Sequence, residues 1–244
     1  YNTGMEKMKQ IMYGVTDFAR IRAENGYFVD RTALIRELEK TSYAMFLRPR
    51  RFGKSLLCAI LQAYYDIKYA PRFEEFFGDL DIGRAPTGEQ GRYLWLDFNF
   101  SQVAKDFGQV QESFNDCCNL RLNKFARDHA NLLPSGVADE ILSRPSCHGK
   151  LNALATGLKG SDLMLYICID EYDNFTNTLL AESRGKYEAL CHGDGFFKQF
   201  FNELKAATTG MNAPITRMFI TGVTPVTMDD VTSGFNIATN ISLN

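Results

Sequence analysis

The sequence lacks the long apolar runs of a membrane-spanning protein and the excess of basic charge that is typical of a nucleic-acid-binding module. Among its 244 residues the longest apolar run covers residues 163–169. That is far shorter than the roughly 20 residues that a membrane-spanning helix needs. Lys plus Arg number 27 and Asp plus Glu 29, so the net charge of −2 lacks the basic excess of a dedicated nucleic-acid-binding module. We therefore expect no membrane partner, while a local basic patch stays open.

Cysteine patterns for a disulfide framework or a zinc site are missing as well. The six Cys include no C-x-x-C pair, and the three His do not stand at zinc-ligand spacing. Cys58 and Cys168 lie inside apolar runs, which is typical of small core residues. Cysteines used in this way indicate a reducing compartment, so we expect a cytoplasmic protein.

What is present is an alternation of apolar strands and amphipathic helices, which predicts an α/β fold with a mostly parallel sheet. The expected strands cover residues 43–47, 93–98, 163–169 and 217–221, with a fifth around Ile241. The expected helices cover residues 16–23, 32–40, 54–68, 101–130, 137–142, 151–158 and 187–207. The run 163–169 is apolar throughout, as expected for a strand covered on both faces.

Two of these helices rest on specific signals. Asp30 is the expected N-cap of the helix over 32–40, whose apolar face would carry Leu34, Ile35 and Leu38. The long helix over 101–130 rests on an apolar stripe at helical spacing. That stripe is formed by Val103, Phe107, Val110, Phe114 and Cys117.

The strongest chemical motif is Gly53-Lys54-Ser55, which follows an expected strand and opens an expected helix. In a phosphate-binding loop, backbone N–H groups at the helix N-terminus face the phosphates. Lys54 would reach the β and γ oxygens of a nucleoside triphosphate as a binding and catalytic residue, and Ser55 would hold Mg²⁺. The motif therefore predicts a nucleotide site.

The loop before this motif departs from the standard G-x-x-x-x-G-K-[ST] pattern, because Arg48 stands where the first Gly would be. The loop is cationic and is stiffened by Pro49. Either its arginines add charge near the phosphates or face a partner, or they are solvated loop charges. The expected nucleotide-binding residues are Arg48, Pro49, Arg50, Arg51, Phe52, Gly53, Lys54, Ser55 and Leu56.

Two further motifs end expected strands. Asp170 and Glu171 follow an apolar strand, where Asp170 would hold Mg²⁺ and Glu171 would polarise an attacking water. Thr221 ends the next strand, where a polar residue would sense the γ-phosphate or position the water. Because ligands of parallel sheets bind at the carboxyl ends of strands, the Gly53-Lys54-Ser55 motif and the acid pair are expected at one edge. The alternatives are an ordinary acid pair after a strand and a Thr that caps a strand end.

Six sequence blocks together resemble the bacterial AAA-ATPase-like family, which is similar to AAA and STAND P-loop ATPases. They are YFVDRT at 27–32, FLRPRRFGKSL at 46–56, LDF at 96–98, IDEYD at 169–173, FITGV at 219–223 and SGFN at 233–236. The RPRRFGKS segment is the most specific. Within that family Arg48 is the regular residue. The family often has Pro where Asn174 stands, and a second Asn and a Leu within the segment 237–239.

The resemblance implies a three-layer P-loop sandwich of about five strands in the ASCE or AAA-like order. It implies binding of ATP and Mg²⁺ and hydrolysis, catalysed by Lys54, Glu171 and Thr221, with Ser55 and Asp170 on the metal. Residues 27–32 would flank the adenine. The hydrolysis would act as a motor or switch for an appended effector domain. The alternatives are a regulatory module that binds nucleotide without hydrolysis, and an accessory module for nucleic-acid processing.

We expect one ATPase domain over residues 13–244. Residues 1–12 are expected to be an N-terminal extension, of which residues 1–4, ahead of Met5, are expected not to belong to the natural chain. A C-terminal lid and a nuclease-like domain are expected to lie outside this chain, and the resemblance leaves nucleic-acid binding through that domain and homo-oligomer formation open. Two further groups have structural interpretations: Phe73, Phe76 and Phe77 as core, and Asp229 and Asp230 as turn acids.

Overall fold

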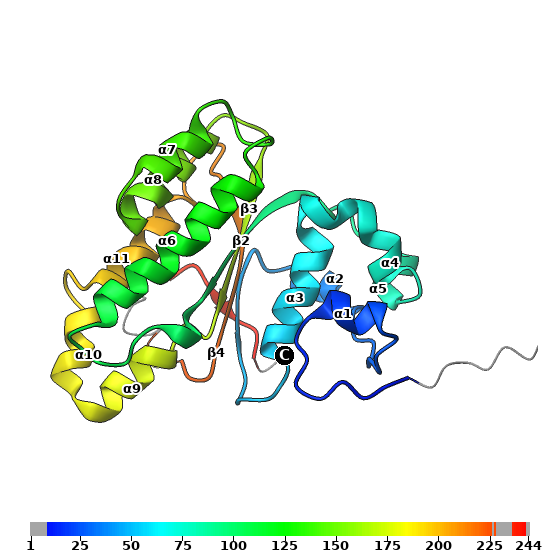
Figure 1. Cartoon of the computed structure of the whole chain (residues 1–244), viewed down its shortest axis with the longest axis horizontal. Helices are drawn as coiled ribbons and strands as arrows, with labels where there is room; N and C mark the ends of the chain where they lie inside the picture. The colour runs from blue at the N-terminus through cyan, green and yellow to red at the C-terminus, as the bar shows by residue number, and fades with distance from the viewer. Residues whose placement is uncertain (1–8, 226, 228–235, 243–244) are drawn as a thin grey trace, which may run out of the picture. The chain divides into compact units, whose positions relative to one another are not determined.

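The computed structural model describes residues 9–225, 227 and 236–242 (Figure 1). The predicted turn acids Asp229 and Asp230, residues 233–235 and most of the predicted extension lie outside the described residues. The chain divides into two compact units. Unit 1 comprises Tyr1–Lys40 and Gly53–Arg92, and unit 2 comprises Thr41–Phe52 and Tyr93–Asn244. Each is described by itself below.

Unit 2 contains a five-stranded sheet in which every strand pair is parallel (Figure 1). Its strands are β1 (Tyr43–Leu47), β2 (Tyr93–Asn99), β3 (Met164–Asp170), β4 (Ile215–Gly222) and β5 (Thr239–Asn240). The order is β2-β3-β4-β1-β5, so β4 separates β1 from β3. The α/β class, the five strands and the ASCE-type order are thereby confirmed.

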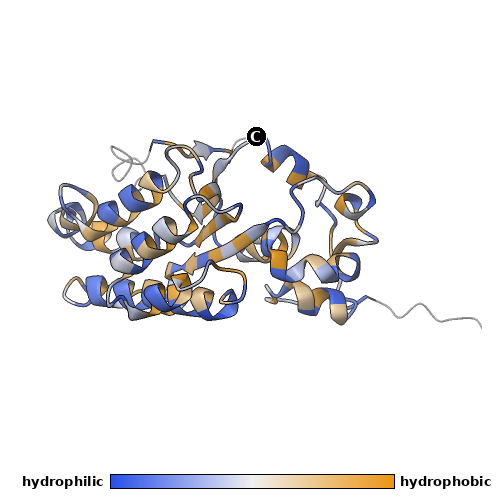
Figure 2. Cartoon of the chain, turned by 90° about the horizontal axis from the view of Figure 1, so that it is seen from above, coloured by the Kyte–Doolittle hydropathy of each residue, from blue (hydrophilic) through white to orange (hydrophobic). Residues whose placement is uncertain are grey.

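Strands β1 to β4 formed where the apolar runs predicted them, and hydrophobic residues recur along the sheet in Figure 2. β5 lies just before Ile241, around which it was expected, and consists of two exposed polar residues. The helices of unit 2 supply a cluster of aromatic rings that packs on β2. Phe98 of β2, for example, lies edge-on to Phe200, with ring centroids 5.3 Å apart. The buried rings of this cluster are Phe98, Phe100, Phe114, Phe175, Phe197 and Phe200.

Six α-helices and one short 3-10 helix are described in unit 2. They are η2 (Phe100–Gln102), α6 (Val110–Asp128), α7 (Val137–Ser143), α8 (Cys147–Leu158), α9 (Asn174–Glu182), α10 (Arg184–Cys191) and α11 (Phe196–Ala206). None of the helices among the described residues of either unit is long and apolar enough to cross a bilayer.

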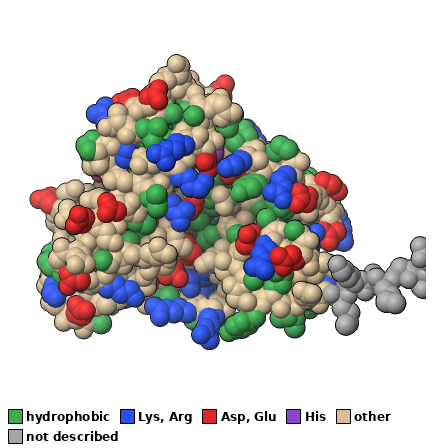
Figure 3. Space-filling view, viewed as in Figure 1, with side chains coloured by type: hydrophobic (Ala, Val, Ile, Leu, Met, Phe, Trp, Pro, Cys, Tyr) green, Lys and Arg blue, Asp and Glu red, His purple; other side chains and the backbone are tan. Residues whose placement is uncertain are grey.

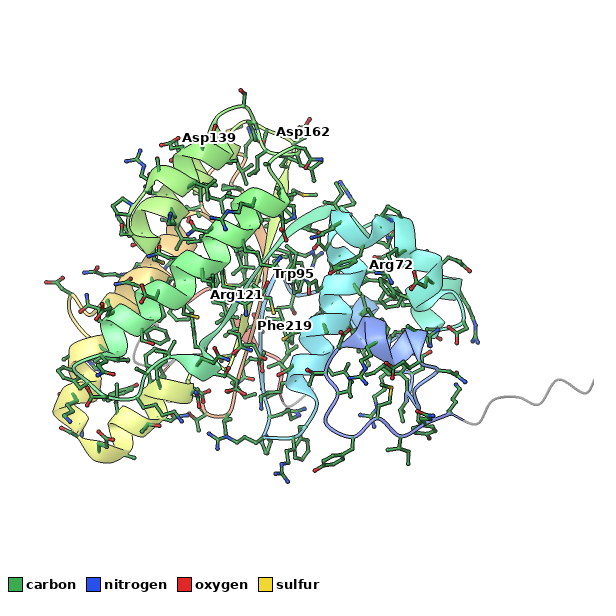
Figure 4. All side chains as sticks on the ribbon, in the orientation of Figure 1. Arg72, Trp95, Arg121, Asp139, Asp162 and Phe219 are labelled. Carbon is green, nitrogen blue, oxygen red and sulfur yellow. The ribbon has the colours of Figure 1, made fainter. Side chains whose placement is uncertain are left out.

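Unit 1 is helical among its described residues. Its elements are α1 (Phe18–Ala23), α2 (Leu34–Leu38), α3 (Lys54–Tyr65), the 3-10 helix η1 (Ile67–Arg72), α4 (Phe73–Phe77) and α5 (Asp81–Arg84). Phe76 and Phe77 are fully buried, which confirms their predicted core role, and Phe77 contacts Phe18 and Tyr64 at centroid distances of 5.3 and 5.5 Å. Arg72, labelled in Figure 4, lies over the ring of Phe76.

The predicted helix over 101–130 begins only at Val110, which corrects its first nine positions. The side chain of Asn99 accepts the N–H of Ser101 (2.9 Å), and that of Asp106 accepts the N–H of Gly108 (3.0 Å). Such local bonds offer the backbone an alternative to the helix. Phe107, expected on the buried stripe, is 39% exposed.

The helix after Asp30 is also shorter than predicted, and Asp30 is not its N-cap. One carboxylate oxygen of Asp30 accepts hydrogen bonds from the N–H (2.9 Å) and the hydroxyl (2.7 Å) of Thr32. The other oxygen accepts a hydrogen bond from the N–H of Asp81 (2.7 Å). The residue that caps α2 is Ala33. Leu34, expected on the apolar face, is 60% exposed.

The predicted helix over 187–207 is two helices, α10 and α11, because two glycines break it. Gly193 has a φ of +53°, which favours glycine. A Cβ on Gly195 would lie 2.1 Å from the carbonyl oxygen of Leu190. The preceding helix α9 was not predicted.

Candidate functional site

The predicted chemical residues of unit 2 gather at one edge of its sheet. Because all strand pairs are parallel, the carboxyl ends of β1, β3 and β4 point to the same edge. Ile169 is level with Ile220 in the register of β3 with β4, so the next residues, Asp170 and Thr221, follow side by side. Phe46 of β1 is level with Thr221. The expectation that these strand ends share one edge is confirmed.

The cationic loop leaves this edge at the end of β1 and leads into α3. Arg51 and Gly53 both adopt left-handed backbone conformations, with φ values of +69° and +76°. Turns of this kind orient successive N–H groups into anion-binding concavities. Gly53 is the N-cap of α3, and the N–H of Leu57 is the first to bond back to its carbonyl, at 2.9 Å.

Lys54, Ser55 and Leu56 form the first turn of α3, which belongs to unit 1. The N-cap residue, Gly53, has no side chain that could cap this helix N-terminus. The N–H groups of a first helical turn have no intrahelical acceptor, and the helix dipole favours negative charge there. The local geometry of this turn therefore suits a phosphate.

Arg48 ties the end of β1 to the last described residues of the chain. Its guanidinium donates to the carbonyls of Leu47 (3.0 Å) and Ser242 and lies 4.7 Å from the centroid of the Phe46 ring. The hydroxyl of Ser242 accepts the N–H of Leu47 at 2.8 Å. Arg48 therefore has a structural role in joining the end of β1 to the last described residues, in addition to the roles considered for the loop arginines.

The rest of the loop is open to solvent. Pro49, Arg50 and Arg51 are exposed, and Phe52 is 65% exposed. A charged side chain without fixed geometry contributes little to stability. Arg50 and Arg51 therefore contribute little to stability through packing.

Asp170 is the last residue of β3 and is only 5% exposed. Its Oδ2 accepts the side-chain N–H of Asn99 at 3.3 Å. The other end of the Asn99 side chain accepts the N–H of Ser101, which fixes the amide orientation. Sequence reasoning gave Asn99 no role; the signal for it is that it ends β2 level with Asp170.

Glu171 follows in a left-handed backbone conformation, with a φ of +54°. This conformation costs a residue other than glycine about 1–2 kcal/mol, and such strain clusters at functional sites. The strained turn places Glu171 directly after the end of β3. The carbonyl of Glu171 accepts the N–H of Asn174 at 3.1 Å, which leads the chain into α9.

Thr221 is fully buried near the end of β4. Within the described residues its hydroxyl has no hydrogen-bond partner. Buried polar atoms are nearly always bonded, so an orphaned hydroxyl at a sheet edge is a candidate ligand contact. The alternative that Thr221 caps a strand end with its hydroxyl has no supporting bond among these residues.

The oxygen donors available fit Mg²⁺ rather than zinc. Among the described residues no group of three or more His, Cys, Asp and Glu could hold a metal ion. Mg²⁺ needs no such group, because it keeps several waters and is held by one or two protein oxygens together with substrate phosphates. The carboxylate of Asp170 and the hydroxyl of Ser55 are donors of that kind.

Charge on the surface of unit 2 is mixed. Acidic and basic side chains are interspersed over its helices on the face seen in Figure 3. Asp97 forms an ion pair with Arg121 of α6 at 3.1 Å; Arg121 is labelled in Figure 4. Asp97 thereby links β2 to α6.

Comparison with known proteins identifies the family. A family model described as "Predicted AAA-ATPase", the AAA-ATPase-like family, matches residues 12–232. The match spans the loop, the strand ends and nearly all of the chain. A comparison with curated proteins gives no match. Membership in an ATPase-like family suggests nucleotide binding. The chain belongs to the AAA-ATPase-like family.

Proposed function

We propose that this chain binds ATP with Mg²⁺ at the loop of residues 48–53 and the first turn of α3, and hydrolyses it. One observation carries the proposal. The cationic loop leaves the carboxyl end of β1 at the sheet edge where β3 ends in Asp170 and where Thr221 lies near the end of β4, and along the chain it leads through the left-handed residues Arg51 and Gly53 into the first turn of α3. Loop, helix N-terminus and strand ends are the parts from which phosphate sites in parallel α/β proteins are built.

The roles follow from the chemistry of each side chain. The N–H groups of the first turn of α3 would donate to the β-phosphate, and Lys54 would pair with the β and γ oxygens. Ser55 and Asp170 would hold Mg²⁺, which when bound neutralises charge on the phosphates. Family membership supports these assignments.

Glu171 would act on the water that attacks the γ-phosphate. A carboxylate accepts a proton or orients the water by hydrogen bonding, and its place in the chain directly after Asp170 puts it beside the metal ligand. Thr221 would donate its orphaned hydroxyl to the γ-phosphate or to that water. Glu171 would thus act in turnover and not in binding of the nucleotide.

Replacing one atom of Glu171 tests the hydrolysis. Glu171→Gln keeps the shape of the side chain and removes its charge and basicity, so Mg-ATP binding should persist while turnover falls by about 100-fold or more. Glu112→Gln on α6, an exposed glutamate, is the matched control and should keep wild-type turnover. If the wild type binds Mg-ATP and neither it nor Glu171→Gln turns it over, the chain is a nucleotide-binding module without hydrolysis.

We further propose that the nucleotide state acts on an effector domain appended to this chain. The support is the resemblance, in which such ATPases precede a further domain. A comparison of the effector's activity with ATP and with ADP, in a chain that contains both parts, tests it; equal activities would refute it.

A further inference from the structure

We propose that Asp173 is a positioning residue that, together with Tyr172, fastens residues 222–224, the end of β4 and the two residues after it, to the turn that carries Glu171. These contacts are called the clamp below. The clamp would keep Glu171 and Thr221 in one fixed arrangement around the reacting water. This inference rests on the function proposed above.

The carboxylate of Asp173 is the centre of the clamp. It is 1% exposed, and its Oδ2 accepts the N–H groups of Val223 (3.0 Å) and Thr224 (2.7 Å). The same oxygen accepts the hydroxyl of Thr224 (3.2 Å) and the side-chain N–H of Asn177 (2.9 Å). Hydrogen bonds to a carboxylate are roughly twice as strong as neutral ones. One buried side chain therefore binds the segment after β4 through three separate donors.

Tyr172 joins the same two segments by a second route. Its N–H donates to the carbonyl of Thr221 (3.1 Å), and its hydroxyl donates to the carbonyl of Thr224. Its ring covers Gly222 so closely that a Cβ there would lie 2.3 Å from a ring carbon. The backbone of Gly222 is in a strand conformation that any residue can adopt. The close contact with Tyr172, and not the backbone conformation, is therefore the reason for a glycine at this position.

The position of Glu171 in the chain makes the clamp relevant to chemistry. Glu171 lies between Asp170, which is fixed in β3, and Tyr172, which is bonded to the backbone of Thr221. Its left-handed backbone is strained, and such strain persists only where surrounding contacts enforce it. The clamp supplies these contacts.

The clamp also reaches α9. Asn177 bonds the carboxylate of Asp173 and accepts the hydroxyl of Thr224 through its Oδ1 (3.1 Å). Thr176 and Thr227 share a hydroxyl–hydroxyl bond of 2.9 Å. A displacement of the end of β4 on nucleotide binding or release would therefore move the first turns of α9.

The test combines kinetics with an observation that needs no nucleotide. Val223 is 39% exposed as a residue and its N–H donates to Asp173, so we expect this bond to slow the exchange of its amide hydrogen. Asp173→Ala and Asp173→Asn are compared with the wild type in the full chain. The amide exchange of Val223 and Thr224 and the kcat and KM for Mg-ATP are measured for each.

The matched control is Asp66→Ala in unit 1. Asp66 is another buried aspartate, 2% exposed, that accepts a backbone N–H, that of Lys68 at 3.0 Å. It should lower stability and leave kcat unchanged. Should Asp173→Ala fail to fold, Thr224→Val removes one donor from the clamp and is measured in its place.

We expect Asp173→Ala to speed the exchange of both amide hydrogens. It should also lower kcat by about tenfold or more and change KM by less than about threefold, because misplacing a catalytic group affects the chemical step. Asp173→Asn keeps an acceptor for the N–H groups and should restore most of kcat. Unchanged exchange at Val223 and Thr224, or a kcat equal to that of the wild type, would overturn the inference. If the wild type binds no ATP, the proposed function fails, and the exchange measurement alone decides whether the clamp exists.

Discussion

Arg48 occupies the position where a standard phosphate-binding loop has glycine, and its replacement separates a structural role from a role in phosphate binding. Its guanidinium makes a 3.0 Å bond to the carbonyl of Leu47, a second bond to that of Ser242, and a cation–π contact at 4.7 Å with Phe46. A charge-assisted hydrogen bond contributes about 1.5–3 kcal/mol when buried, and an exposed cation–π contact about 0.5–1 kcal/mol. Because Arg48 is only half-buried, solvent weakens these interactions to less than the sum of their ordinary values, and we expect Arg48→Ala to lower the free energy of unfolding by roughly 2 kcal/mol.

The single tryptophan of the chain makes this measurable. Trp95 lies on β2 of the same sheet and is labelled in Figure 4, so its fluorescence reports unfolding of unit 2 in urea. Arg50→Ala is the matched control, because Arg50 lies in the same loop and is exposed, and it should change stability by less than about 0.5 kcal/mol. The reasoning is refuted if Arg48→Ala is as stable as Arg50→Ala. A stable Arg48→Ala that loses Mg-ATP affinity would assign Arg48 to the phosphates instead.

Two further predictions concern packing and pH. Gly222→Ala should lower the free energy of unfolding by about 1–3 kcal/mol, because its Cβ would overlap the ring of Tyr172; a denaturation midpoint equal to that of the wild type would contradict this. Burial acts to raise the pKa of Asp30, but hydrogen bonds from Thr32 and from the N–H of Asp81 outweigh it and leave the pKa below the ordinary value of 3.8. Because the folded pKa is the lower one, this stabilisation is present above about pH 4 and is lost as the pH falls through the folded value. The free energy of unfolding of Asp30→Asn should therefore fall less than that of the wild type between about pH 5 and pH 3, as measured by urea titrations followed by circular dichroism. An identical fall in both proteins would show that ionised Asp30 contributes nothing to stability.

The strands were predictable because their signal is local. Each of β1 to β4 is a short apolar run followed by a loop, and a buried parallel strand needs little more. Asp170 and Thr221 could be placed together for the same reason, since parallel strands bring their carboxyl ends to one edge whatever lies between them.

The errors arose where short-range side-chain bonds or a close approach of the backbone override helical periodicity. Phe107 fits a helical stripe, yet the bonds formed by Asn99 and Asp106 hold residues 100–109 out of the helix. Gly195 breaks a helix because of a close approach to the carbonyl of Leu190, which periodicity does not reveal.

The contacts that order the candidate site were equally hidden. Asp173 bonds Val223, and Arg48 bonds Ser242, and in each case the partners meet only once the sheet has formed. Asp173 and Arg48 both lie in sequence blocks that resemble the family, so the sequence indicated that they matter but did not show what they bind.

Binding of Mg-ATP by calorimetry, to the wild type and to Lys54→Ala, tests the central claim most directly. Lys105→Ala, which removes an exposed lysine from the loop before α6, is the control. The account predicts that the wild type and Lys105→Ala bind with equal affinity and that Lys54→Ala binds about tenfold more weakly or not at all, because Lys54 pairs with the phosphates. A wild type that does not bind while its circular dichroism shows the fold intact, or a Lys54→Ala variant that binds as tightly as the wild type, would contradict it.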